Sequence, residues 1–272
     1  MVAEPRLAST VILVREAAAT SGGQAYQVFM VRRPVRSEFA ADVYVFPGGT
    51  VRSDDLDPAV GAACAPFGPD DALRRLAERG GAPPASDHEA LALHVAALRE
   101  LYEEAGVLLA EPRPEAAPSF RPGDRAERLA LGRLGVQAGH LSLAALARNE
   151  GLRLACEQLI YFSHWVTPRP YPRRYDTRFF VATLPAGQQA LHCDIETVAG
   201  VWVTPSEALE GYGRGDFPLV LVTQRHLERI AGQRTLDDLL RFARSKPIVS
   251  VQPEVYDDSL EPFLPQELEG CW

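Results

Sequence analysis

Three closely spaced glutamates are the residues of this sequence best placed to do chemistry. Glu100, Glu103 and Glu104 lie in the segment from Arg99 to Val107. At about 100° per residue, a helix places Glu100 and Glu104 one turn apart on the same face, with Glu103 beside them. Carboxylates this close repel one another unless a cation neutralises them, and Mg²⁺ and Mn²⁺ prefer such oxygen ligands. The spacing therefore indicates either a divalent-metal site or a solvated acidic helix face.

The residues before these glutamates predict the helix that carries them. Ser86 and Glu89 form an S-x-x-E capping box, which predicts a helix start near residue 87, and Gly106 is a typical helix C-terminus. Apolar residues repeat along the segment at spacings of three and four: Leu91, Val95, Leu98, Tyr102 and Ala105. We expect the helix to bury this apolar face and to present the three carboxylates on the other.

The acidic segment resembles the box of the Nudix hydrolase family. The box reads Gly-x5-Glu-x7-Arg-Glu-U-x-Glu-Glu-x-Gly-U, where U is apolar, and Arg99 to Val107 matches its second half at every specified position. Pro47-Gly48-Gly49 resembles the Gly-Gly lead-in, with Gly49 as the first box residue. The sequence departs from the box in two ways. Asp55 stands in the place of the first Glu, and the 43 residues 56–98 separate it from Arg99 where the box has seven.

One Nudix subgroup, the peroxisomal-type nucleoside-diphosphate-linked-moiety-X type 19 enzymes, carries a long insertion at this point of the box, and the sequence resembles that subgroup. Other segments that resemble this subgroup are Val45–Gly49, His164–Pro168, Arg173–Phe180, and Asp194-x-Glu196 before Trp202-x-Thr204-Pro205. The resemblance covers roughly residues 8–231. It implies an α/β/α sandwich in which the box forms a loop, a helix and a second loop.

The remaining pattern predicts an α/β fold. Strands are expected at 8–14, 26–32, 43–46, 159–167, 178–184 and 198–203, and helices at about 70–79, within 125–150, after Pro205, at 224–231 and at 236–245. The first two strands are close enough to form a hairpin, which favours a mixed sheet with helices packed on it over a doubly wound parallel sheet. We expect one domain over residues 1–246, with an insertion at about 56–86 inside the box and additional C-terminal helices. Residues 247–272 are expected to form an extension packed on that domain.

The resemblance also implies roles for individual residues. The implied ligands of Mg²⁺ or Mn²⁺ are Glu100, Glu103, Glu104 and a backbone carbonyl near Gly48 or Gly49. Arg99 would orient the carboxylates. Glu100 is the first candidate for the general base, and Glu196 is the second, because the family often supplies a late Glu from a loop before a closing strand.

Three arginines are candidates for binding the substrate. Arg173, Arg174 and Arg178 could clamp phosphates, since a guanidinium recognises them in a bidentate manner. The alternative is that they form structural salt bridges with Asp176 and its neighbours.

The implied reaction is hydrolysis of a diphosphate linkage in a nucleoside diphosphate derivative. The subgroup resemblance favours coenzyme A or acyl-CoA, cleaved to 3′,5′-ADP and (acyl-)phosphopantetheine. The same chemistry on NADH, ADP-ribose or nucleotides is an alternative. A second alternative is a ligand-sensing Nudix module without catalysis, but the box retains all three acids and no basic helix-turn-helix is evident.

Composition excludes several other classes of protein. The 272 residues carry a net charge of −8 with a pI near 5.3, which argues against a nucleic-acid partner. No apolar run approaches the length of a membrane span, so no membrane partner is expected. Four cysteines without a C-x-x-C pair do not predict zinc and suit a reducing compartment, so we expect a cytoplasmic protein. A homodimer is a further expectation, since many relatives dimerise.

Overall fold

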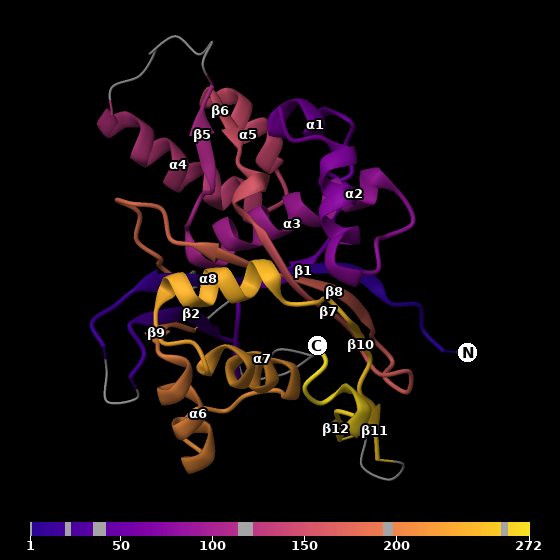
Figure 1. The fold of residues 1–272 in the computed structure, drawn as a ribbon. Helices are drawn as coiled ribbons and strands as arrows, with labels where there is room; N and C mark the ends of the chain where they lie inside the picture. Colours follow the sequence, from indigo (N-terminus) through magenta and orange to yellow (C-terminus); the bar gives the residue numbers. More distant parts are fainter. Residues whose placement is uncertain (1, 20–22, 35–41, 114–121, 193–197, 257–260) are drawn as a thin grey trace.

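A mixed sheet lies at the centre of the computed structural model, which describes the chain except for residues 1, 20–22, 35–41, 114–121, 193–197 and 257–260 (Figure 1). The strands of this sheet are β1 (Arg6–Glu16), β2 (Tyr26–Arg32), β3 (Tyr44–Val45), β4 (Gly48–Thr50), β7 (Ile160–Val166), β8 (Tyr175–Thr183), β9 (Ala199–Val203) and β10 (Ser250–Val251). Their order is β10-β7-β8-β1-β2-β3, with β4 paired to β1 and β9 paired to β2. Because β1 runs parallel to β8 but antiparallel to β2, the predicted mixed sheet is confirmed.

Helices cover both faces of the sheet (Figure 1). On one side lie α1 (Ala59–Cys64), α2 (Pro69–Ala77), α3 (Asp87–Ala105), α4 (Pro122–Gln137) and α5 (Leu143–Asn149). On the other lie α6 (Pro205–Arg214), α7 (Leu221–Ala231) and α8 (Leu236–Ser245). Short elements complete the description: β5 (Ala110–Pro112), β6 (Leu152–Leu154), β11 (Glu254–Val255), β12 (Pro262–Phe263) and the 3₁₀ turns Glu78–Gly80, Cys156–Gln158 and Gln266–Leu268.

The central strand β1 shows why two helical layers are needed. Val11 and Leu13 point into the core on the α1–α5 side, whereas Ile12 and Val14 point into the core on the α6–α8 side. All four side chains are fully buried. A strand that is apolar on both faces must be covered on both, so this alternation produces the α/β/α sandwich that was predicted.

The strand that follows Pro47 was not predicted. The sequence places the end of a strand at Phe46, but Gly48–Thr50 continues as β4 and pairs antiparallel with residues Ala8–Thr10 of β1. A Cβ on Gly48 would lie 2.6 Å from the carbonyl oxygen of Ser9, so only glycine fits this close approach. The pairing holds the start of the box against the centre of the sheet.

Helix α3 has the predicted bounds. Ser86 Oγ accepts a hydrogen bond from the Glu89 amide at 3.1 Å, and Gly106 ends the helix with a φ of +67°. The prediction of one buried and one open face is wrong, because residues 90–105 are all buried. The helix packs on β1 and β4, and α2 from the insertion and α4 from beyond the box also contact it, so residues 90–105 are covered on every side.

Residues after α8 return to the α6–α8 side of the sheet. Strand β10 pairs in parallel with β7, and the Trp272 ring lies 4.9 Å from that of Trp165 and is almost fully buried. Lys246 Nζ donates to the Phe162 carbonyl at 2.8 Å. The division into a domain at 1–246 and an extension at 247–272 stays a prediction. Within the described ranges, no helix has both the length and the apolar content needed to cross a bilayer.

A buried histidine in α3 makes stability depend on pH. His94 is fully buried between Phe67 and Phe180, and burial lowers its pKa to about 4. Between pH 6.5 and 4 the unfolded chain therefore binds a proton that the folded chain does not, so the free energy of unfolding decreases as pH falls. We expect His94 to contribute about 2 kcal/mol of this decrease between pH 7 and pH 5. Urea denaturation of wild type and His94→Leu at both pH values measures it, and equal pH dependence of the two proteins would contradict the assignment.

Candidate active site

The two glycines of β4 lie against two of the predicted glutamates. The Gly48 amide donates to Glu104 Oε2 at 3.0 Å. A Cβ on Gly49 would lie 2.6 Å from Cδ of Glu100, so this backbone also touches the second carboxyl group. Strand β4 and helix α3 thus bring Gly48, Gly49, Glu100 and Glu104 into one cluster, although Gly48 and Glu104 lie 56 positions apart in the chain.

Arg99 connects the two halves of the box, which residues 56–98 separate in the chain. Its Nε donates to Asp55 Oδ1 at 3.0 Å and its Nη2 donates to Asp55 Oδ2 at 2.8 Å. Its Nη1 donates to Glu100 Oε1 at 2.6 Å, and its Nη2 also reaches the Thr50 carbonyl at 2.8 Å. Asp55 therefore pairs with the box arginine from the position at which the family has its first Glu, despite the shorter side chain and the inserted residues.

This ion pair is deeply buried. The side chains of Arg99 and Asp55 are 0% and 2% exposed. Burial alone would lower the pKa of Arg99, but the hydrogen bond to Asp55 and the charges of Glu100, Asp55 and Glu103 raise it above its ordinary value. The guanidinium therefore stays charged and fixes the orientation of Glu100.

Arg52 is a site residue that the sequence interpretation missed. Its Nη1 and Nη2 donate to the two carboxylate oxygens of Glu103, each at 2.8 Å, and Nη1 also reaches the Val136 carbonyl at 3.2 Å. Glu103 is completely buried, and Arg99 Nη1 lies 3.5 Å from its Oε1. A signal was present in the sequence, because Arg52 stands between Gly49 and Asp55, both of which the box brings against the helix.

The cluster has the donor chemistry of a divalent-metal site. Asp55, Glu100 and Glu103 bond the guanidiniums of Arg52 and Arg99, and Glu104 accepts from the Gly48 amide. Carboxylate oxygens such as these are the ligands that a hard divalent cation prefers. The side chains are not arranged as a finished coordination shell: among the described residues, no three His, Cys, Asp or Glu side chains form a metal-binding group. Glu103 in particular would have to exchange its bonds to Arg52 for a metal.

Gly49 gives a direct test of the contact between β4 and α3. A methyl group on Gly49 would overlap the Glu100 carboxyl, so Gly49→Ala is expected to displace Glu100 and lower kcat by about a hundredfold. Gly61→Ala is the control, because a Cβ there has no atom within 4 Å. Equal kcat for the two variants in a hydrolysis assay would show that Glu100 does not depend on this contact.

Two of the three arginines predicted to clamp phosphates are buried and bond other parts of the protein. Arg178 is 1% exposed and donates to Asp176 and to the Ala82 carbonyl. Arg174 is also buried, with Nε bonded to the Thr167 carbonyl at 3.0 Å and Nη1 bonded to the Ala3 carbonyl at 2.8 Å. Both positions favour the alternative structural role. Arg173 is exposed and remains a predicted substrate ligand.

The second candidate for the general base cannot be placed. Glu196 lies outside the described residues. Glu100, the first candidate, lies beside Gly49 in the cluster.

Comparison with known proteins agrees with this geometry. The family described as the NUDT19 Nudix domain matches residues 5–222. The chain is 29% identical over 249 residues to acyl-coenzyme A diphosphatase NUDT19 of Gallus gallus, covering 82% of this chain and 66% of that protein. It is 27% identical over 256 residues to the same enzyme of Homo sapiens, covering 84% and 67%. The chain thus spans about two thirds of these relatives.

A solved structure shares the fold. The Nudix hydrolase of Alicyclobacillus acidocaldarius superposes with a TM-score of 0.63 at 24% identity, covering 90% of this chain and 98% of that one. Members of this family generally use divalent metals. The family match covers residues 5–222, and the fold and the pairing of Arg99 with Asp55 agree with it. The chain therefore belongs to the Nudix hydrolases, in the NUDT19 Nudix domain family.

Proposed function

We propose that this chain hydrolyses the diphosphate linkage of coenzyme A or an acyl-CoA with Mg²⁺ or Mn²⁺, giving 3′,5′-ADP and (acyl-)phosphopantetheine. The observation that carries the proposal is the cluster of box residues, in which Arg99 bonds both Asp55 and Glu100 and β4 lies against Glu100 and Glu104. Relatives over most of the chain are acyl-CoA diphosphatases by name, which supports this substrate over other diphosphates.

The reaction requires an activated water and neutralised phosphate charge. A bound divalent cation would supply both, by lowering the pKa of the water and by stabilising the attacking and leaving oxygens. Glu100, Glu104 and a carbonyl of Gly48 or Gly49 would hold it, together with Glu103 once Arg52 releases that carboxylate. Arg99 keeps Glu100 in place, and Glu100 is our first choice to accept the proton of the water, with Glu196 second.

A substrate panel tests the proposal. The protein is incubated with Mg²⁺ or Mn²⁺ and with coenzyme A, acyl-CoA, NADH, ADP-ribose and nucleoside triphosphates, and the products are identified by mass. The expected products are 3′,5′-ADP and phosphopantetheine species. A clear preference for NADH or ADP-ribose would contradict the assignment of coenzyme A as the substrate but would still agree with diphosphate hydrolysis. Tight binding of one compound without turnover of any would instead indicate a ligand-sensing module.

The cysteines support a reducing compartment, and we propose the cytoplasm. Four cysteines in 272 residues are too few for a disulfide-stabilised scaffold, and disulfides are rare in reducing compartments.

A further inference from the structure

Arg52 bonds a glutamate that is an implied metal ligand. The pattern Gly-x5-Glu leaves the residues between Gly49 and Asp55 unspecified, so the family resemblance does not imply this arginine. In the structure, the two carboxylate oxygens of Glu103 accept from its guanidinium, each at 2.8 Å. A side chain of the protein itself therefore engages both oxygens that a metal would use at Glu103.

The two partners of this ion pair differ in exposure. The Glu103 side chain is 0% exposed, whereas that of Arg52 is 31% exposed. A buried carboxylate without a cation is strongly disfavoured, but a partly exposed guanidinium regains water when its ion pair breaks. Glu103 thus needs a positive charge beside it, and Arg52 is the partner that can leave.

Arg99, the second arginine of the cluster, is held more firmly. Its side chain is 0% exposed, and its three nitrogens donate to Asp55, to Glu100 and to a backbone carbonyl. Arg52 bonds, besides Glu103, a backbone carbonyl of α4 at 3.2 Å. Releasing Arg52 therefore breaks fewer buried hydrogen bonds than releasing Arg99 would.

A divalent cation and the Arg52 guanidinium cannot both hold the Glu103 carboxylate in this way. A metal bound through Glu103 needs at least one of its two oxygens, and two cations on one carboxylate repel each other. The affinity for the metal is therefore reduced by the free energy needed to break the bidentate pair, which is a strong, charge-assisted interaction. The same pair neutralises the Glu103 charge when the metal concentration is low.

We infer that Arg52 is an internal cation that competes with the divalent metal for Glu103 and thereby sets the metal concentration at which the site is loaded. The inference rests on the proposed function, since it takes Glu103 as a metal ligand. It adds a regulatory residue that the family pattern does not specify. Arg52 acts through Glu103 and is therefore a positioning residue.

The test is Mn²⁺ binding to the full chain without substrate, followed by the electron paramagnetic resonance signal of the free ion. Arg52→Gln removes the competing charge and is expected to bind Mn²⁺ at least tenfold more tightly than wild type. Arg52→Lys retains a charge but not the bidentate geometry, and its affinity is expected to lie between the two. Unchanged or weaker binding in Arg52→Gln would overturn the inference, because removing a residue that only shapes the site would weaken metal binding.

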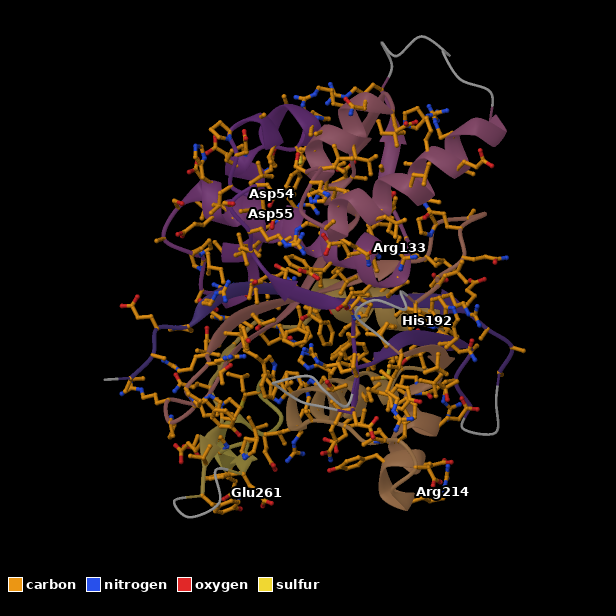
Figure 2. The ribbon with its side chains drawn as sticks, turned by 180° about the vertical axis from the view of Figure 1, so that it is seen from behind. Asp54, Asp55, Arg133, His192, Arg214 and Glu261 are labelled. Atoms are coloured by element: carbon orange, nitrogen blue, oxygen red, sulfur yellow. The ribbon has the colours of Figure 1, made fainter. Side chains whose placement is uncertain are left out.

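Arg133 provides the matched control for the loss of a positive charge. Its Nε donates to the backbone carbonyl of Glu103 at 3.0 Å, so this bond engages the backbone of the same residue. Figure 2 shows Arg133 on the same side of the sheet as Asp55. Arg133→Gln is expected to leave the Mn²⁺ affinity within twofold of wild type. An equal gain in both variants would show that general electrostatics, and not competition for Glu103, causes the effect.

A double-mutant cycle makes the test specific for Glu103. In the Glu103→Gln background the carboxylate is gone, and adding Arg52→Gln is expected to change the Mn²⁺ affinity by less than twofold. A tenfold gain that persists in this background would contradict competition at the carboxylate. If Arg52→Gln alone fails to fold, Arg52→Lys replaces it: it should bind Mn²⁺ more tightly than wild type, and should have no such effect in the Glu103→Gln background.

Thermal denaturation gives a second readout. Without metal, Arg52→Gln is expected to have a lower melting temperature than wild type, because Glu103 loses its cation. Saturating Mn²⁺ is expected to raise the melting temperature of the variant by more than that of wild type, since tighter binding stabilises the folded state more. An equal or smaller rise in the variant would count against competition.

The binding measurement also separates this inference from the proposed function. If no coenzyme A species is hydrolysed but Arg52→Gln binds Mn²⁺ at least tenfold more tightly, the proposed function fails and the competition stands. If coenzyme A is hydrolysed and Arg52→Gln gains no affinity for Mn²⁺, the inference fails alone.

Discussion

Replacing Glu104 by Gln is expected to lower kcat for diphosphate hydrolysis by about a thousandfold, a loss typical of removing one electrostatic group from an active site. Gln has the same shape, and its amide oxygen can still accept from the Gly48 amide, which now bonds Glu104 at 3.0 Å. What is lost is one carboxylate charge next to β4. Steady-state kinetics with saturating Mg²⁺ measure the effect, and circular dichroism checks that the variant is folded.

Two companion variants show whether the loss is specific. Glu89→Gln removes a charge from the first turn of the same helix, far from the cluster, and kcat should stay within twofold. Glu103→Gln should reduce kcat by about ten- to a hundredfold, the usual effect for a residue that orients a metal site, since Arg52 engages both oxygens of Glu103. An unchanged kcat in both Glu103→Gln and Glu104→Gln would contradict the assignment of these glutamates as metal ligands.

Replacing Arg99 by Met is expected to reduce the free energy of unfolding by about 3–5 kcal/mol, because it leaves buried carboxylates without their cation. Arg99 and Asp55 are almost completely buried, and Arg99 also bonds Glu100 and lies 3.5 Å from Glu103. Denaturation by urea at pH 7 gives the value. Activity should also fall, since Glu100 loses the group that orients it.

The control for this variant is a surface ion pair. Arg74 bonds Asp71 in α2 and is 64% exposed, so Arg74→Met should change stability by less than about 1 kcal/mol. A double variant, Arg99→Met with Asp55→Asn, should be less destabilised than the sum of the single variants, whereas Asp54→Asn, at the neighbouring residue labelled in Figure 2, should show no such coupling. Strict additivity for Arg99 and Asp55 would contradict the buried pair.

Periodicity predicted the elements that depend on local sequence. The bounds of α3 follow from Ser86 and Gly106, and β1 and β2 follow from their β-branched, apolar residues. The family pattern predicted which acids would meet, and the placement of Glu100 and Glu104 at the two glycines agrees with it. These features lie on one helix or beside one turn, where spacing in the chain determines spacing in the molecule.

Features that depend on distant contacts were not predictable in this way. The open face expected for α3 is absent because β4 lies against Glu100 and Glu104, and because Arg52 bonds Glu103. The role of Arg52 depends on a contact 51 residues away along the chain. Arg174 and Arg178 are of the residue type that clamps phosphates, but their bonds to the Ala3 and Ala82 carbonyls favour a structural role.

Equilibrium binding of Mn²⁺, followed by the electron paramagnetic resonance signal of the free ion, tests the central claim most directly. Wild type is expected to bind Mn²⁺ tightly without substrate, and Glu104→Gln is expected to bind it at least tenfold more weakly, while Glu89→Gln behaves as wild type. Identical binding curves for wild type and Glu104→Gln would contradict the claim that the cluster at Gly48, Gly49, Glu100 and Glu104 holds the metal.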